Sequence, residues 1–480
     1  MPGIEQLSRE QLLVVVAEQA AVIEAQAAQI AALTAQIAAL TAQVAELTRR
    51  LGQNSSNSSL PPSSDRFTKP PRSRGKGSAR KPGKQPGAPG AGLEMTAEPD
   101  EIIDHHPDAC GGCGAGLHGA APAGMVVRQV HDLPPVKARV VEHRMHRRRC
   151  GCGRVSTAPA PAGVDAPVSY GPQVRAFAVY LVVFQHVPVQ RAALLIADLT
   201  GLAPSTGWIS AQVARCSDML TGVEDLIKTG VAAAAVIGVD ETTVNIAGTK
   251  QWLHVARTDF LTAYHLHPSR GRKAVAEFGI LPTYRGTVMH DALAVYDTYP
   301  ATHALCGAHL LRELTAAGEA HPGELWPVQA ARALVELTNA ARAAREQSLP
   351  VIPADLAAGP LREFRQAVLV GLAQHPRGPG RKQSKARNLL KRLHDREAEI
   401  LRFTVDLAVP FTNNGSERDL RPVKTQLKIS GCHRSATGAS AWLRVRGYIS
   451  TARKHGHDVL TALHDAVTGN PWKPPAAPAT

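Results

Sequence analysis

Three acidic residues have the surroundings expected of metal ligands. Asp240 interrupts an apolar segment, Asp291 ends another, and Glu417 lies near the start of a predicted helix. A buried carboxylate without a partner is costly, so such residues usually pair with a cation or cap a turn. Turn capping is the alternative for Asp291, and Glu241 competes with Asp240 as the ligand. The chemistry these residues predict is the binding of divalent cations by clustered carboxylates.

The segment around Glu417 is strongly basic. Residues 410–457 contain nine lysines and arginines, and Glu417 and Asp419 are the only acids. A few acids in a basic strip fit a metal ligand beside a phosphate backbone. The candidate phosphate contacts next to the acid are Arg418, Arg421, Lys424 and Lys428.

Four of the seven cysteines are spaced like zinc ligands. They form a C-x-x-C pair, Cys110 and Cys113, and a C-x-C pair, Cys150 and Cys152. Four thiolates satisfy tetrahedral zinc and leave no position for water, so we expect one structural Zn²⁺. The alternatives are ordinary reduced cysteines, or replacement of one ligand by a histidine. The histidines near enough are His105, His106 and His146.

The chain between the two cysteine pairs is rich in valine, which predicts short strands at 124–130 and 136–145. Arginines surround the second pair, so we expect this module to face DNA. The arginines proposed for that contact are Arg147, Arg148 and Arg149.

A second basic region lies in a linker rich in Asn, Ser and Pro at 52–92. A flexible tether with clustered positive charge contacts phosphates without reading base sequence. A purely solubilising linker is the alternative. The basic residues proposed to contact DNA are Arg72, Arg74, Lys76, Arg80, Lys81 and Lys84.

Residues 16–51 carry a heptad repeat with β-branched residues at a and leucine at the later d positions. This pattern favours a parallel two-stranded coiled coil, and therefore a homodimer or a higher homo-oligomer. The alternative is an amphipathic helix that packs on the protein's own core.

The elements that must position the acids follow a helical segment at 170–229. Within it, 191–199, a turn at Gly201 and 205–214 resemble a helix-turn-helix. Strands are then predicted at 235–246, 251–258 and 261–267, and a helix at 272–278. Further strands at 286–291 and 303–305 lead into a helix at 308–317. Three strands, a helix, a strand, a helix and a strand is the order of the ribonuclease-H-like α/β fold.

The overall composition is that of a multidomain globular protein. The chain has 480 residues, 44% of them apolar, and a net charge of +14, which favours an anionic partner such as nucleic acid. The sequence contains no run of about 18 uncharged apolar residues, so it predicts no membrane span. Glutamates interrupt the N-terminal apolar stretch, which is unlike a secretory signal. The few cysteines predict a cytoplasmic protein with reduced thiols.

The predicted domains follow these changes of pattern. They are a coiled-coil helix at 1–51, a basic linker at 52–100, a zinc module at 101–160, a helical segment at 165–230, a catalytic domain at 231–457 with a helical insertion at about 318–405, and a tail at 458–480.

Several motifs, in this order, resemble the insertion sequence 66 family of bacterial transposases. They are GQNSSNSSLPPSSD at 52–65, the cysteine pairs, YGPQVRAFAVYL at 170–181, GVDETTVNIAG at 238–248, MHDALAVY at 289–296, HALCGAHLLREL at 303–314, FTNNGSERDLRPVKTQLKISGCHRS at 411–435 and STARKHG at 450–456. The resemblance implies a DDE triad of Asp240, Asp291 and Glu417, with a helical insertion before the last acid. It also matches Cys306 and His309 to a C-x-x-H feature, which we interpret as structural.

The mechanism that this resemblance implies uses two Mg²⁺ ions, or Mn²⁺, clamped by the three acids. One ion activates water or a DNA 3′-hydroxyl and the other stabilises the departing oxygen. Asp240 would bridge both ions, while Asp291 and Glu417 would each hold one. The P-loop motif is absent from the sequence, so ATP is not implied.

The expected activity is cleavage of element ends and strand transfer into target DNA, with element-encoded helper proteins as further partners and a location at the bacterial nucleoid. Two other functions compete: a ribonuclease-H-like nuclease without strand transfer, and a non-enzymatic coiled-coil zinc protein that binds DNA.

Overall fold

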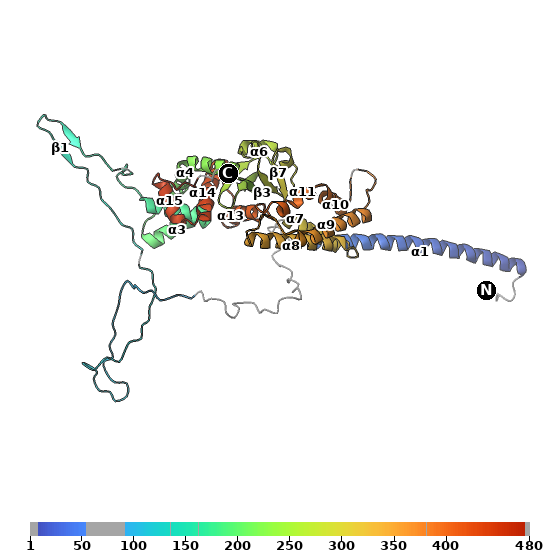
Figure 1. The fold of residues 1–480 in the computed structure, drawn as a ribbon, viewed down its shortest axis with the longest axis horizontal. Helices are drawn as coiled ribbons and strands as arrows, with labels where there is room; N and C mark the ends of the chain where they lie inside the picture. Colours follow the sequence, from blue (N-terminus) through green and yellow to red (C-terminus); the bar gives the residue numbers. More distant parts are fainter. Residues whose placement is uncertain (1–7, 54–91, 135, 162, 381, 476–480) are drawn as a thin grey trace.

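The computed structural model describes residues 8–53, 92–134, 136–161, 163–380 and 382–475 (Figure 1). The N-terminal part holds one long helix, α1 (Arg9–Leu51), and a small hairpin of β1 (Arg147–Arg149) and β2 (Val155–Thr157). The predicted helix is therefore confirmed. Its apolar a and d side chains are exposed, as Ile30 at 65% and Ile37 at 64% illustrate, and no described part of the chain covers them.

Among the described helices, only the stretch Arg9–Thr48 is long and apolar enough to cross a membrane by length and composition. Glutamines and threonines recur along the whole helix. Their spacing fits the heptad interpretation better than a lipid environment does.

The helical segment that precedes the sheet begins with α2 (Pro172–Val179) and a π-helical turn, η3 (Tyr180–Phe184). It continues through α3 (Val189–Thr200), α4 (Thr206–Met219) and α5 (Thr221–Ala233). The turn between α3 and α4 is the predicted one: Gly201 has a left-handed φ of 75°, and the Ser205 hydroxyl caps α4 by accepting from the Trp208 N–H.

The centre of the molecule is a five-stranded mixed sheet with the order β5-β4-β3-β6-β7. Its strands are β3 (Val236–Ile246), β4 (Thr249–Arg257), β5 (Thr262–His267), β6 (Thr287–His290) and β7 (Thr302–Leu305), with α6 (Arg272–Phe278) between β5 and β6. The first three strands are antiparallel neighbours, and β6 and β7 pair in parallel with β3 and with each other. This confirms the predicted ribonuclease-H-like α/β core. One difference is that a single 3₁₀ turn, η4 (Tyr296–Thr298), links β6 to β7 in place of a full helix.

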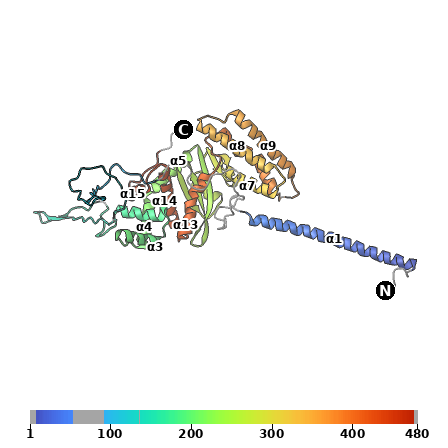
Figure 2. The ribbon, with the colours of Figure 1, turned by 90° about the horizontal axis from the view of Figure 1, so that it is seen from below.

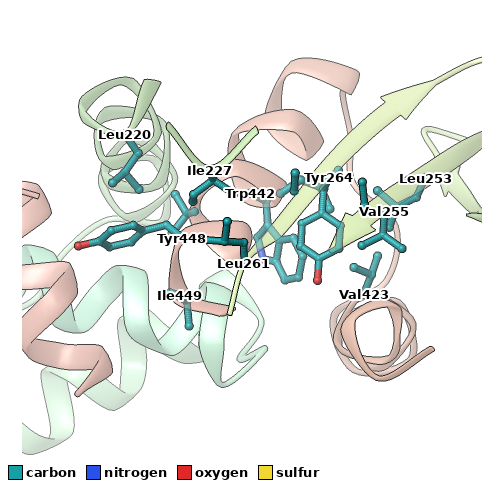
Figure 3. Packing of buried hydrophobic residues seen from close by; sticks show 14 of the residues in the cluster. Leu220, Ile227, Leu253, Val255, Leu261, Tyr264, Val423, Trp442, Tyr448 and Ile449 are labelled. Carbon is teal, nitrogen blue, oxygen red and sulfur yellow. The ribbon is translucent and has the colours of Figure 1, made fainter. Parts of the chain in front are cut away.

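Three C-terminal helices complete this core: α13 (Asn414–Ser430), α14 (Ala436–Lys454) and α15 (Val459–Val467). Figure 3 shows Val423 of α13 beside Val255 and Tyr264 of the sheet, while Trp442 and Tyr448 of α14 fill the space towards α5. The packing of α13 therefore fixes the helix that carries Glu417 against β3 and β4.

The insertion forms a second apolar core of its own. It contains α7 (Gly307–Ala320), α8 (Trp326–Glu346), α9 (Ala354–Gln374), α10 (Lys385–Asp395), α11 (Glu397–Ile400) and α12 (Arg402–Val405). Trp326 and Phe364 are among its fully buried side chains. In Figure 2, α8 and α9 lie beyond α7, on the side of the sheet away from α14.

The two ends of this helical excursion are joined to each other. The Gly307 N–H donates to the Phe411 carbonyl at 2.9 Å, and the Cys306 sulfur accepts from the Asn413 N–H at 3.1 Å. A Cβ on Gly307 would lie 2.1 Å from the Phe411 ring, so only glycine permits this approach. Cys306 thus has a structural contact across 107 residues of sequence.

Two predictions about local structure are wrong. The described residues of 124–130 and 136–145 form no strands, and valines there stay exposed, as Val130 at 91% and Val140 at 88% show. Valine favours strands only where a partner strand and a buried face exist, and neither is present here. Residues 459–467, predicted as a tail, form α15 with Leu463 and Ala466 fully buried.

Candidate active site

The first two acids meet because β3 and β6 are parallel neighbours. Gly238 lies opposite Met289 in this ladder, so continuing the register by two residues brings Asp240 beside Asp291. Asp291 follows directly after the last residue of β6. The sheet therefore places a carboxylate from a strand interior next to one from a strand end.

Glu417 is brought to the same region by the start of α13. The Asn413 side-chain amide donates to the Val239 carbonyl at 2.7 Å, directly before Asp240 in β3. The Ser416 hydroxyl in turn donates to the Asn413 side-chain oxygen at 2.7 Å. The buried side chain of Asn413 thus anchors the helix to the strand.

A glycine in β3 makes this anchoring possible. A Cβ on Gly238 would lie 2.5 Å from the Asn413 side-chain oxygen and 2.8 Å from the Ser416 hydroxyl. Both distances are shorter than real Cβ contacts allow, so any larger residue would push α13 off the strand. A glycine between apolar residues, directly before the acid, is the sequence signal for this close approach.

We expect Gly238→Ala to lower DNA cleavage by about 10²-fold, because a misplacement of about 1 Å at a reacting group has that effect. Cleavage of a labelled DNA substrate measures it. The control is Gly222→Ala in α5, where a Cβ would meet nothing within 4 Å. Equal activity of the two variants would show that the close contact does not position Glu417.

The electrostatics of Asp240 are those of an incomplete cation site. Burial raises the pKa of Asp240 well above its usual value, and the negative charges of Glu241, Asp291 and, more weakly, Glu417 raise it further. The Glu241 N–H donates to its carboxylate at 2.8 Å. Within the described residues, neither Asp240 nor Asp291 forms an ion pair. Two partly buried acids without a basic partner of their own fit the binding of a divalent metal ion.

The third acid has a partner that the sequence did not reveal. Arg312 of α7 donates to the Glu417 carboxylate at 3.1 Å, and both side chains are mostly buried. His309, one turn earlier, is influenced electrostatically by both Asp291 and Glu417, although burial is the main cause of its lowered pKa. Its Nδ1 is buried without a hydrogen-bond partner. The helix that begins the insertion thus supplies one wall of the site.

The neighbouring acids Glu241 and Asp297 are held elsewhere. Glu241 lies on the opposite face of β3 from the first acid, where Arg270 donates to it at 2.6 and 2.8 Å and the Tyr296 hydroxyl at 2.5 Å. Asp297 lies past the end of β6, in η4, and pairs with Arg396 at 2.7 Å. Both carboxylates are already satisfied by protein donors.

Asp419, two residues after Glu417, belongs to a buried ion-pair network. Lys454 donates to it at 2.8 Å, the Arg257 Nε lies 3.4 Å away, and the hydroxyls of Thr262 and Ser450 donate at 3.1 and 3.3 Å. With these partners Asp419 ties α13 to α14 and to the strands β4 and β5. Its geometry is structural, which leaves Glu417 as the acid of this helix that faces the other two.

The basic strip divides into an exposed stripe and an inward-facing group. Arg418, Arg421 and Lys428 are exposed on α13, and Arg421 and Lys428 continue the helical row that begins at Glu417. Lys424 was predicted to contact a DNA phosphate, but in the structure its ammonium donates to the Thr243 carbonyl at 2.5 Å. Other basic residues predicted to line the strip are also turned inward: Arg444, Arg446 and Lys454.

The other candidate DNA contacts lie outside this core. Arg147, Arg148 and Arg149 form the exposed strand β1 at the end of an extended arm (Figure 1). The six basic residues of the linker fall between 54 and 91, outside the described residues: Arg72, Arg74, Lys76, Arg80, Lys81 and Lys84.

Each cysteine pair forms a tight turn. The Cys110 N–H donates to Ala115, and the Cys150 N–H donates to Arg154. Backbone N–H groups of the partner cysteines, Cys113 and Cys152, are the main cause of a lowered pKa in Cys110 and in Cys150. That direction favours the thiolate, which is the form that binds zinc.

The two pairs do not converge on one point in the structure. Within the described residues, two groups of three or more ligand atoms lie within 4.8 Å of one another, and neither contains a cysteine. Each pair therefore fits half of a tetrahedral zinc site, and a four-cysteine site requires the two turns to approach each other.

Comparison with known families agrees with this organisation. Residues 167–441 match the family described as Transposase IS66 family, and residues 107–153 match the zinc-finger binding domain of transposase IS66. Residues 16–94 match a family of unknown function, and no curated protein matches the chain. The first match covers more than half of the 480 residues. The chain belongs to the IS66 family of DDE transposases.

Proposed function

We propose that Asp240, Asp291 and Glu417 are the catalytic acids that hold two Mg²⁺ ions during DNA cleavage and strand transfer. The observation that carries this proposal is that the partly buried Asp240, whose pKa is raised by desolvation and by the acids around it, has no basic partner in the described part of the chain. Bound divalent ions supply the positive charge that activates an attacking hydroxyl and stabilises the leaving oxygen.

The side chains around the acids have separate tasks in this proposal. Asn413 and Ser416 fix the start of α13, so that Glu417 stays close to Asp240 in β3. Arg312 orients the Glu417 carboxylate through the pair at 3.1 Å. The exposed residues Arg418 and Arg421 follow along α13, where they are suited to hold the DNA backbone beside the acids.

The experiment that tests this function uses linear DNA that carries the terminal repeats of the element. We expect the full chain with Mg²⁺ to nick at the repeat ends and to join the released 3′ end to a second DNA, with no products in a chelator. Cleavage without joined products would indicate a nuclease that lacks strand transfer. No cleavage under any divalent metal would contradict the proposed catalytic acids.

We further propose that Arg147–Arg149, the exposed face of α13 and the basic linker contact DNA phosphates, and that the protein acts at the nucleoid in the cytoplasm. A hairpin with three successive exposed arginines is suited to backbone contact without base reading. Helper proteins from the same element remain proposed partners for the same reaction.

For the zinc module we propose one Zn²⁺ held by Cys110, Cys113, Cys150 and Cys152. We expect Cys110→Ser to lose this zinc and to unfold the module, because zinc binding supplies folding free energy in such small units. DNA-end binding should fall while the catalytic core stays folded. Elemental analysis and circular dichroism measure both effects, and Cys432→Ser, at an exposed cysteine outside the module, is the control. Unchanged zinc content in Cys110→Ser would contradict the four-cysteine site.

For α1 we propose self-association through its exposed heptad stripe. Replacing Ile30 and Ile37 together by Asn should lower the mass observed in sedimentation, because both occupy a positions. The matched control replaces the b-position neighbours Ala31 and Ala38 by Asn, which keeps the same polarity change on the same helix. Removal of residues 1–51 should have the effect of the first variant. If the truncated protein keeps the same number of chains per assembly, the self-association interface lies elsewhere.

A further inference from the structure

Three metal-ligating side chains meet in the insertion, away from the acids and the cysteines. His321 ends α7, Glu324 lies in the turn before α8, and His375 ends α9. Their ligand atoms all lie within 4.8 Å of one another. The His375 Nε2 is 2.7 Å from one Glu324 oxygen, and the His321 Nδ1 is 3.7 Å from the other.

The surroundings hold these three side chains in place. The buried Trp326 donates its indole N–H to Glu324 at 2.6 Å, and its ring packs on the His375 ring with centroids 6.0 Å apart. The two histidine rings are in edge-to-face contact at 4.8 Å. Burial raises the pKa of Glu324, but hydrogen bonds from His375 and Trp326 outweigh it and lower the pKa overall.

A comparison within the chain shows why this cluster differs from a second one. His290, Asp297 and His303 also lie within 4.8 Å of one another. There the Arg396 guanidinium already binds Asp297 at 2.7 and 3.3 Å, so a fixed positive charge occupies the place of a metal ion. Within the described residues, the ion pairs of Glu324 are with His321 and His375 only.

We propose that His321, Glu324 and His375 form a Zn²⁺ site in the helical insertion. Two imidazoles and one carboxylate are an established zinc ligand set, with a water molecule in the fourth position. Bond lengths of about 2.0–2.1 Å separate the ligand atoms of a tetrahedral zinc by about 3.3 Å. The observed 2.7 and 3.7 Å run to two different oxygens of Glu324, and the ligand atoms lie within 4.8 Å of one another, so the three side chains must shift to bind one ion. The His375 Nε2 must then release its proton to solvent or carry it on Nδ1 instead.

The bound ion would join the ends of α7 and α9 to the turn before α8. These are the helices around Trp326 in the second apolar core. Zinc would thus stabilise the insertion by a mechanism independent of the cysteine module, and its open position would remain accessible because His321 is 37% exposed.

The test uses the full chain with Cys110→Ser, which removes the four-cysteine site, in a background of Asp240→Asn and Asp291→Asn, which removes the proposed catalytic ions from the measurement. Titration with Zn²⁺ alone should show one remaining site, and zinc should raise the midpoint of thermal unfolding. Adding His321→Gln or His375→Gln should weaken zinc binding more than about 100-fold, since even the loss of an outer-shell partner costs about 10- to 100-fold. His394→Gln, at an exposed histidine of α10, is the control and should bind normally.

Co²⁺ in place of Zn²⁺ separates the two sites by their spectra. The site in Cys110→Ser should give visible ligand-field bands of nitrogen and oxygen ligands without thiolate charge-transfer absorption. Circular dichroism and metal-free unfolding establish that the glutamine variants are folded. The proposal is overturned if folded Cys110→Ser binds no zinc at micromolar concentration, or if both histidine variants bind it as tightly as the control.

Discussion

Asp240→Asn, Asp291→Asn and Glu417→Gln are each expected to lower DNA cleavage and strand transfer by about 10³-fold or more, while DNA binding is retained. Each change keeps the side-chain volume and removes a charge that bound divalent ions require. The loss corresponds to several kcal/mol of transition-state stabilisation, at about 1.36 kcal/mol for each factor of ten. Single-turnover cleavage of end-labelled DNA measures the activity, and filter binding or anisotropy measures the affinity.

The control for these variants is Asp297→Asn, which removes a partly exposed carboxylate six residues after Asp291. Its partner Arg396 also pairs with Glu399, so little should change. Near wild-type cleavage by Glu417→Gln, with loss of cleavage in a folded Asp419→Asn, would mean that the third acid is misassigned. Activity in all three variants of the proposed triad would contradict the assignment as a whole.

The second large effect concerns stability. Asp419→Ala is expected to destabilise the catalytic core by about 3–5 kcal/mol, because removal of one member of a buried ion pair leaves an uncompensated charge. The charges left behind are those of Lys454 and Arg257, whose side chains are 16% and 13% exposed. Thermal unfolding followed by circular dichroism measures the shift of the core transition.

Asp259→Ala is a matched control because Asp259 pairs with the same Arg257 at 3.0 Å but is 84% exposed. An exposed pair of this kind contributes about 0–1 kcal/mol. Combining Asp419→Ala with Lys454→Met should recover part of the lost stability, since the unpaired ammonium is then removed as well. Equal stability of the Asp419 and Asp259 variants would show that the buried network does not stabilise the core.

The strand positions of Asp240 and Asp291 could be predicted from the residue pattern, whereas their membership of one site was implied by the resemblance to the insertion sequence 66 family. Strand pairing is a local consequence of apolar patterning and turns, so these elements can be read from the sequence. The contacts of Glu417 could not be read in this way. Asn413 reaches Val239 across 174 residues and Arg312 reaches Glu417 across 105, and such distant pairs depend on tertiary packing.

The predictions made from the count of basic residues and from strand propensity differ from the structure for a related reason. A count of lysines and arginines does not tell which side chains face inward: Lys424 is partly buried and Arg446 is buried in the core. The valines between the cysteine pairs favour strands, but no described strand pairs with that segment. In both cases the missing information is the position of neighbours distant in sequence.

The joined ends of the insertion have a consequence for how this chain can change. Cys306 and Gly307 are hydrogen-bonded to Asn413 and Phe411. The helical insertion therefore leaves and re-enters the catalytic core at one place. Its length costs little at that junction, since closure entropy grows only slowly with loop length. Homologous insertions of other sizes, or a fluorescent reporter grafted at the exposed tip between α9 and α10, should therefore leave Glu417 in register with Asp240. The helical insertion can therefore be replaced by one of another size, in evolution or by engineering, without displacing the catalytic acids.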